Sequence, residues 1–132
     1  ITGHPSSNLD SFFFDDDTLK QLLTENGRDA DINIIEGVMG YYDGLRLNTA
    51  RCSTFEIAQK TESPAVLVVD AKGASLSVLA VLHGFLTFAQ NSRIEGVILN
   101  RCTAMTYPAL KTAIEALFEG RIRPRGKILP QK

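Results

Sequence analysis

Three short apolar runs constrain the fold of this chain more than any other feature of its sequence. Each run is followed at once by a polar side chain: residues 32–35 by Glu36, residues 65–69 by Asp70 and residues 96–99 by Asn100. Short β-branched runs bounded by glycine or proline are typical of buried strands. The continuous run at residues 65–69 is typical of a parallel strand covered on both faces.

Helical patterns separate these strands. The acids at 15–17 precede one helical pattern and are interpreted as its N-terminal cap rather than as a metal site. Ser53 and Thr54 begin a second helix, with Glu56 close to the capping-box position. Two more helices are predicted at 75–89 and 107–118, and a last strand at 122–129. Alternating strands and helices predict an α/β fold, a three-layer parallel sheet with right-handed crossovers and helices on both faces.

Composition excludes several classes of protein. The 132 residues carry a net charge of −1, so we expect neither a nucleic-acid nor a membrane surface. No apolar run approaches the roughly 20 residues that a membrane span needs. Cys52 and Cys102 lie far apart without a metal-binding motif, which indicates free thiols in a reducing compartment, and therefore a cytoplasmic protein.

The loop that follows residues 32–35 holds the strongest functional signal. Glu36 and Asp43 lie among three glycines, Gly37, Gly40 and Gly44. Ligands of open parallel sheets bind beyond the carboxyl ends of the strands, and glycines let the backbone approach a ligand closely. Two carboxylates there suit a magnesium ion that bridges phosphate oxygens. For an isolated Glu-Gly pair, a capping acid followed by a solvated turn is an equally good interpretation.

Several segments together match one family. They are Thr-Gly-x-Pro-Ser-x-Asn-Leu-Asp at 2–10, Ile-Glu-Gly-Val-Met-Gly-x-Tyr-Asp-Gly at 35–44, Ser53-Thr54, and the strand runs at 64–70 and 96–101. Over nearly its whole length the chain resembles the cobyrinic acid a,c-diamide synthases of cobalamin biosynthesis. These proteins are related to dethiobiotin synthetase within the P-loop NTPase-like fold. The block at 35–44 is the most specific part of the resemblance.

The resemblance implies an ATP- and Mg²⁺-dependent ligase, a glutamine amidotransferase. Members phosphorylate the a and c side-chain carboxylates of a corrin (tetrapyrrole) substrate. Ammonia that a second, glutaminase domain releases from glutamine then displaces the phosphate. The implied roles are catalytic for Glu36 and Asp43, with Glu36 also the metal ligand; substrate-binding for Asn8, Asp10 and Tyr42; and nucleotide-binding for Gly37, Asn100 and Arg101.

The chain also departs from the family. It contains no P-loop, Gly-x-x-x-x-Gly-Lys-Ser/Thr, and no glutaminase motif. We therefore expect residues 1–132 to be the central and C-terminal part of the ATP-binding synthetase domain, a truncated P-loop NTPase-like fold that is inactive by itself. An exposed sheet edge would favour self-association. The alternatives are a related synthetase acting on nickel sirohydrochlorin or a dethiobiotin precursor, and a non-catalytic ParA/MinD-like binding module.

Overall fold

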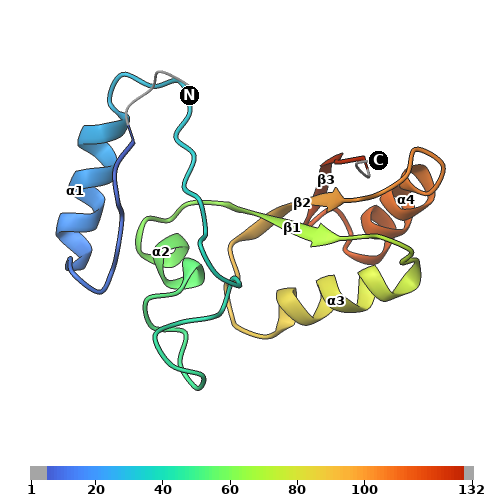
Figure 1. Cartoon of the computed structure of the whole chain (residues 1–132), viewed down its shortest axis with the longest axis horizontal. Helices are drawn as coiled ribbons and strands as arrows, with labels where there is room; N and C mark the ends of the chain where they lie inside the picture. The colour runs from blue at the N-terminus through green and yellow to red at the C-terminus, as the bar shows by residue number, and fades with distance from the viewer. Residues whose placement is uncertain (1–5, 130–132) are drawn as a thin grey trace. The chain divides into compact units, whose positions relative to one another are not determined.

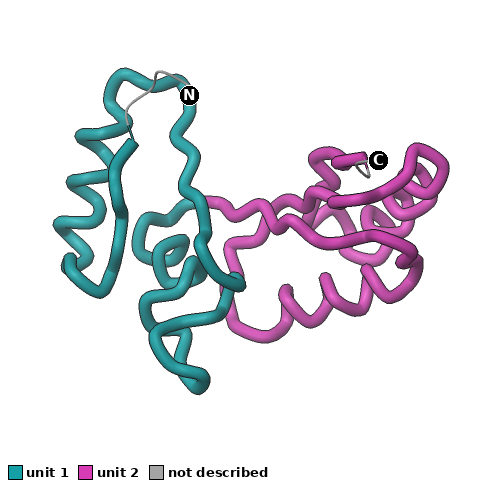
Figure 2. The backbone as a smooth tube through the Cα atoms, in the orientation of Figure 1, with its two compact units in different colours: residues 1–63 teal, residues 64–132 magenta. Residues whose placement is uncertain are grey.

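The computed structural model describes residues 6–129, in two compact units (Figure 2). Residues 2–5 of the first family motif and the end of the chain at 130–132 lie outside the described residues. The first unit covers residues 1–63 and the second covers 64–132. The elements along the chain are α1 (Asp16–Gly27), α2 (Thr54–Lys60), β1 (Ala65–Asp70), α3 (Leu76–Thr87), β2 (Ile94–Asn100), α4 (Tyr107–Leu117) and β3 (Arg123–Lys127) (Figure 1).

In the first unit, α1 begins where the acidic triplet predicts. Asp15 is the N-cap, and its carboxylate accepts a hydrogen bond from the backbone N–H of Thr18 at 2.9 Å. Asp16 and Asp17 lie in the first turn, where negative charge favours the helix dipole. The hydrogen bonds from Thr18 hold the pKa of Asp15 below its usual value. The capping interpretation of the triplet is confirmed.

The start of α2 is also as predicted. Ser53 is its buried N-cap, and the hydroxyl oxygen accepts from the backbone N–H of Glu56 at 3.2 Å. The Glu56 carboxylate reaches back as in a capping box, but it accepts from the N–H of Cys52, one residue before the cap.

The prediction of a strand at residues 32–35 is wrong. These residues adopt no regular secondary structure, and the side chains of Ile32 and Ile34 are 75% and 85% exposed. A strand exists only where a neighbouring strand pairs its N–H and C=O groups. Among residues 6–129, no strand pairs with this run. Its local pattern is that of a strand, but the described chain provides no partner for it.

The second unit is a parallel α/β structure, as expected. β1 pairs with β2 and β2 pairs with β3, all parallel, in the order β1-β2-β3. In this register Asp70 lies opposite Asn100, so the two polar strand ends predicted from the sequence are neighbours. The structure therefore brings the ends of β1 and β2 together at one edge of the sheet.

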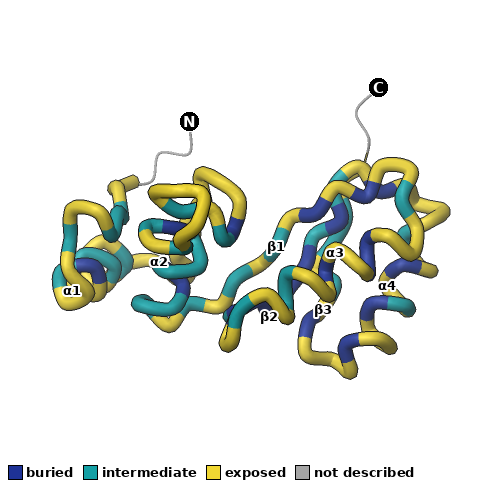
Figure 3. Tube along the Cα trace, turned by 90° about the horizontal axis from the view of Figure 1, so that it is seen from below, coloured by how far each residue is buried: buried dark blue, intermediate teal, exposed yellow. Residues whose placement is uncertain are grey.

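The core of the second unit lies between the sheet and α3 and α4. These helices contact each other and α4 packs on β3, so both cover the same face. Several large side chains of this unit are fully buried: Leu82, Val97, Leu99, Ile114, Phe118 and Ile122. Figure 3 colours the buried parts of the chain dark blue. On β1, by contrast, Val66 and Val68 are 49% and 57% exposed. Within the described second unit, β1 is thus covered on one face and not on both, because the two crossover helices of the sheet, α3 and α4, lie on the same side of it.

Among residues 6–129, no helix has the length and apolar character needed to cross a membrane.

Candidate functional site

A cavity of about 300 Å³ lies in the first unit, where three segments of the chain meet. The segments are the loop before α1, the glycine-rich acid loop and the start of α2. The cavity is lined by Leu9, Asp10, Ser11, Ile35, Glu36, Val38, Met39, Asp43, Cys52, Ser53, Thr54 and Ile57. Three carboxylates that the sequence singled out, those of Asp10, Glu36 and Asp43, therefore share one cavity.

Asp10 is held by its own loop. Its Oδ1 accepts from the backbone N–H of Phe12 at 2.8 Å, while its carbonyl accepts from the N–H groups of Phe13 and Phe14. The next residue, Ser11, donates its hydroxyl to the carboxylate of Glu56 on α2 at 2.7 Å. The loop before α1 is thus bonded both within itself and to α2.

Glu36 is exposed at the cavity, and the next residue, Gly37, lies close to the side chain of Thr54. A Cβ atom added to Gly37 would lie 2.6 Å from Oγ1 of Thr54, the first residue of α2. Contacts that short do not occur between real side chains, so glycine is required for the loop to approach α2 this closely. The position of Glu36 at the cavity depends on this approach.

The position of the Asp43 carboxylate depends on a second glycine, Gly40. Its backbone N–H donates to the carbonyl of Gly40 at 2.9 Å in a tight turn. A Cβ atom at Gly40 would lie 2.2 Å from Oδ2 of Asp43. The absence of a side chain at position 40 therefore leaves room for the Asp43 carboxylate where it lies.

The acids that line the cavity fit a metal site shared with a bound nucleotide better than a site made of protein ligands alone. Nowhere in the described part of the chain do three His, Cys, Asp or Glu side chains gather closely enough to hold a metal ion by themselves. Mg²⁺ bound with nucleotides commonly takes only one or two carboxylates, and water and phosphate oxygens complete its shell. The exposed carboxylate of Glu36 fits this second arrangement.

Asn8 and Tyr42 are not among the residues that line the cavity. Asn8 is exposed. The ring of Tyr42 packs against Tyr41 and Phe55, with ring centroids 4.9 and 5.1 Å apart. Their predicted contacts with substrate stay predictions, and the structure gives Tyr42 a packing role.

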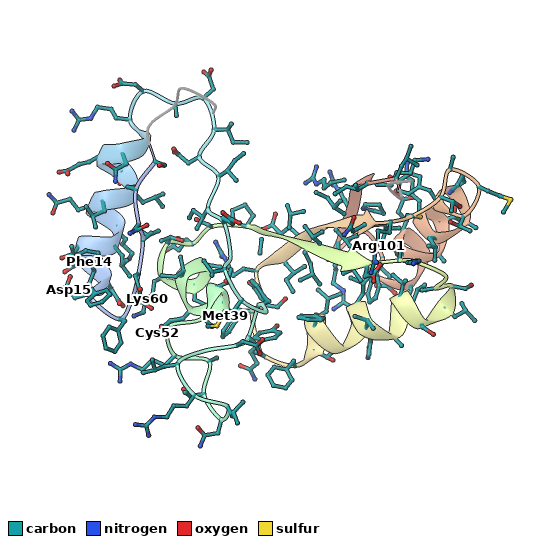
Figure 4. The ribbon with its side chains drawn as sticks, in the orientation of Figure 1. Phe14, Asp15, Met39, Cys52, Lys60 and Arg101 are labelled. Carbon is teal, nitrogen blue, oxygen red and sulfur yellow. The ribbon has the colours of Figure 1, made fainter. Side chains whose placement is uncertain are left out.

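Asn100 and Arg101 belong to the second unit, at the carboxyl end of β2. Arg101 adopts a left-handed backbone conformation, with φ of 55°, and its guanidinium forms an ion pair with Asp70 at the end of β1. One of these bonds, from Nε to Oδ1, is 3.0 Å long. The Arg101 side chain, labelled in Figure 4, and the N–H of Lys72 hold the pKa of Asp70 below its usual value. Asn100 accepts at its carbonyl from the N–H of Ala71.

Sequence reasoning missed several cavity residues. Met39 and Cys52, labelled in Figure 4, line the cavity beside Ser11 and Thr54. The signal for Ser11 and Thr54 was available, because Ser11 follows Asp10 and Thr54 belongs to the helix start recognised as a cap. Met39 lies between Glu36 and Asp43 in the acid loop. Cys52 carried no motif of its own.

Comparison with known proteins identifies relatives that share one name. Three proteins named cobyrinate a,c-diamide synthase match: one from Listeria monocytogenes, 47% identical over 117 residues and 87% of this chain; one from Salmonella typhimurium, 44% identical over 116 residues and 87% of the chain; and one from Methanocaldococcus jannaschii, 41% identical over 99 residues and 75% of the chain. The chain spans about a quarter of the length of these relatives: 26%, 25% and 22%. No family model and no solved structure matches the chain.

Proposed function

Because this chain belongs to the cobyrinate a,c-diamide synthase family, we propose that it forms part of an ATP- and glutamine-dependent amidoligase acting on the a and c carboxylates of cobyrinic acid. The observation that supports this most is the cavity that Asp10, Glu36 and Asp43 share. Three carboxylates around one cavity repel one another unless a cation or a hydrogen-bond donor joins them. A site for a metal-bound polyphosphate and an acid substrate meets that requirement.

The proposed reaction has two steps. A substrate carboxylate oxygen attacks the γ-phosphorus of ATP, the bond from that phosphorus to the β-phosphate oxygen breaks, and ADP leaves. The nitrogen of ammonia from glutamine then attacks the acyl carbon, the bond to the phosphate oxygen breaks, inorganic phosphate leaves, and the nitrogen loses a proton to give the amide. Such phosphoryl transfer depends on positioning and on charge around the phosphates more than on covalent chemistry by the protein.

In this scheme Glu36 is the ligand for Mg²⁺. Held by Glu36, Mg²⁺ would supply positive charge beside the phosphate oxygens. Asp43, on the same loop, orients the substrate carboxylate relative to that charge, and Asp10 lies on the opposing loop. Gly37, next to Glu36, is proposed to contact the nucleotide phosphates through its backbone.

The remaining proposed contacts come from the family resemblance. Asn8 and Tyr42 are proposed to contact the corrin, and Asn100 and Arg101, at a strand end of the second unit, to contact the nucleotide. In this structure the Arg101 guanidinium forms an ion pair with Asp70. Because the 132 residues contain no P-loop, we propose that they do not turn over ATP alone.

The test is amidation of cobyrinic acid by the full-length gene product with ATP, Mg²⁺ and glutamine, followed by mass spectrometry. We expect Glu36→Gln and Asp43→Asn each to lower the rate by at least roughly 100-fold, as expected when a group that stabilises the transition state is removed. Asp29→Asn is the matched control, since Asp29 is an exposed acid of the same unit that does not line the cavity. Unchanged rates in both cavity variants would contradict the proposed roles.

The same assay separates the competing functions. If the wild-type protein amidates nickel sirohydrochlorin and not cobyrinic acid, the reaction class stands and the substrate is wrong. ATP-dependent joining of a diaminononanoate and CO2 into a cyclic urea, with no side-chain amide formed from glutamine, would instead identify a dethiobiotin synthetase. A protein that binds nucleotide and consumes none would support the ParA/MinD-like binding module.

A further inference from the structure

The loop that carries Asp10 and the helix that follows it, α1, are each bonded to one face of α2. Ser11 Oγ donates to Oε2 of Glu56 at 2.7 Å, and Lys60 Nζ lies 2.8 Å from Oδ1 of Asp16. Glu56 and Lys60 are themselves an i,i+4 pair on that helix, with 3.2 Å between Lys60 Nζ and Glu56 Oε1. The loop of Asp10 is therefore bonded to α2 through Ser11, whereas Lys60 joins α2 to the start of α1.

The two carboxylate oxygens of Glu56 have different partners. Oε2 accepts from the Ser11 hydroxyl and from the backbone N–H of Cys52, whereas Oε1 faces Lys60. Cys52 and Ser11 both line the cavity, from two segments far apart in the sequence. One oxygen atom thus joins the loop of Asp10 to the segment just before α2, and both line the cavity.

The Glu56 carboxylate is well suited to this task. Its side chain is only 23% exposed, and burial raises its pKa. The hydrogen bonds from Ser11 and Cys52, together with Lys60, outweigh that effect and leave the pKa below the ordinary value of a glutamate. The group is therefore ionised at neutral pH, and hydrogen bonds to an ionised acceptor are among the strongest in proteins.

We propose that Glu56 is a positioning residue for the amidation: through Ser11 and Cys52 it fixes the position of Asp10 in the cavity that Asp10 shares with Glu36 and Asp43. This inference rests on the proposed function, because it assigns Asp10 to the same site. It goes beyond that function, because Glu56 does not itself line the cavity. The cap of α2 does not require this carboxylate, since Ser53 caps the helix through the backbone N–H of Glu56.

The contacts provide variants that separate positioning from stability. Ser11→Ala removes the bond to the Asp10 loop and leaves the Glu56–Lys60 and Lys60–Asp16 pairs. Lys60→Met removes both pairs and leaves the bonds of Glu56 to Ser11 and Cys52. Ser11→Thr keeps a hydroxyl at position 11 and serves as the conservative rescue variant.

The first experiment is steady-state kinetics of the full-length gene product with the tetrapyrrole acid. Ser11→Ala and Glu56→Ala should each lower kcat/KM for the acid roughly 10-fold, the effect expected for one hydrogen bond to a charged group. The double variant should be no worse than Glu56→Ala, because both changes break the same bond. In these variants the KM for ATP should change by less than about twofold. The kcat/KM of Lys60→Met for the acid should stay within about twofold of the wild type. Ser11→Thr should retain most of the wild-type kcat/KM.

Independent, additive effects of Ser11→Ala and Glu56→Ala would overturn the proposal. So would equal losses in KM for ATP and for the acid, since a general loss of structure affects both.

The second experiment needs no activity. Hydrogen–deuterium exchange should be faster at the amides of Phe13 and Phe14, which donate to the Asp10 carbonyl, in Ser11→Ala and Glu56→Ala but not in Lys60→Met. Unchanged exchange in the first two variants would overturn the proposal. If the wild type forms no amide while exchange changes as expected, the proposed function fails and the Glu56 link to the loop stands.

Discussion

Gly40 and Gly44 lie in the same loop, yet a methyl group at each would meet different neighbours. At Gly40 the nearest atom is a flexible carboxylate oxygen of Asp43, at 2.2 Å, which can move. At Gly44 the nearest atoms are the backbone carbonyl oxygens of Arg51 and Thr49, at 2.3 and 2.4 Å. The same substitution should therefore affect function at one site and folding at the other.

We predict that Gly40→Ala displaces the Asp43 carboxylate and lowers amidation by roughly 100-fold, the effect of a misplacement of about 1 Å in a reacting site. The melting temperature should change little. The measurement is the amidation assay together with thermal denaturation. Gly84→Ala is the control: Gly84 lies in α3 with no atom within 4 Å of an added Cβ, so alanine should stabilise the helix by up to about 1 kcal/mol and leave the rate unchanged. Full activity in Gly40→Ala would contradict the placement of Asp43.

Gly44→Ala should instead destabilise the protein. Its methyl group meets backbone that cannot rotate away, and overpacking of this kind reduces the free energy of unfolding by roughly 1–3 kcal/mol. Chemical denaturation of the variant and the wild type measures the difference. A variant of Gly44 as stable as the wild type would show that the turn at residues 44–51 relaxes freely.

Glu56 gives a prediction about pH. Its folded-state pKa is below the ordinary value, so the folded protein binds this proton less readily than the unfolded chain. The contribution to stability is complete above the unfolded pKa of about 4.3 and is lost as the pH falls through the folded pKa. Glu56→Gln should therefore show a smaller loss of unfolding free energy between about pH 5 and pH 3 than the wild type. If the unfolding free energies of Glu56→Gln and the wild type fell equally over this pH range, the hydrogen bonds assigned to Glu56 would be contradicted.

At the scale of elements, the predictability of the fold depended on whether its determinants were local. Asp15 and Ser53 were predicted as helix starts because a cap is set by the few residues around it. β1 and β2 were predicted because their apolar runs are continuous and end in polar residues. The run at residues 32–35 had a similar pattern, but no strand among the described residues pairs with it. The presence or absence of a pairing strand cannot be predicted from the residues of the run itself.

For the candidate site, too, residues could be predicted where the signal was local in the sequence. Glu36 and Asp43 could be predicted because they lie on one glycine-rich loop, and Asp10 because of the family motif. The link from Glu56 to Ser11 could not, because it joins residues 45 positions apart in the sequence. Tyr42 was predicted to bind substrate from the motif alone, and the packing of its ring on Phe55 is a tertiary contact that the motif does not reveal.

Ser53 provides a prediction for α2. Ser53→Ala removes the hydroxyl that accepts from the N–H of Glu56 and leaves that N–H without its cap. Loss of a serine N-cap lowers the free energy of unfolding by about 1 kcal/mol, and Ser53 is 1% exposed, so water cannot replace the hydroxyl readily. Urea denaturation measures the change. Ser53→Thr, which keeps a hydroxyl that can cap, is the control and should lose less stability than the alanine variant.

At the scale of the whole molecule, the described sheet has an open side at β1. β1 is an edge strand, and Val66 and Val68 are exposed on the face away from α3. Unpaired edges and exposed apolar side chains favour association with another chain. We therefore predict that the 132-residue chain self-associates as its concentration rises, which light scattering after gel filtration detects.

Val68→Lys should reduce this association, because a charge on an edge strand opposes pairing. Leu76→Lys is the control, since Leu76 is an exposed apolar residue of α3, 75% exposed, and not of β1. A chain that remains monomeric at the highest concentration, or that associates equally in both variants, would contradict a role for the β1 edge.

The central claim is that the cavity of Asp10, Glu36 and Asp43 serves the phosphorylation of a substrate carboxylate. The most direct test supplies cobyrinic acid with a heavy oxygen isotope in its carboxylates to the full-length gene product, with ATP and glutamine. If an acyl phosphate forms, the inorganic phosphate released with each amide contains one labelled oxygen, and Glu36→Gln yields almost no labelled phosphate. Amide formation with unlabelled phosphate would contradict the account.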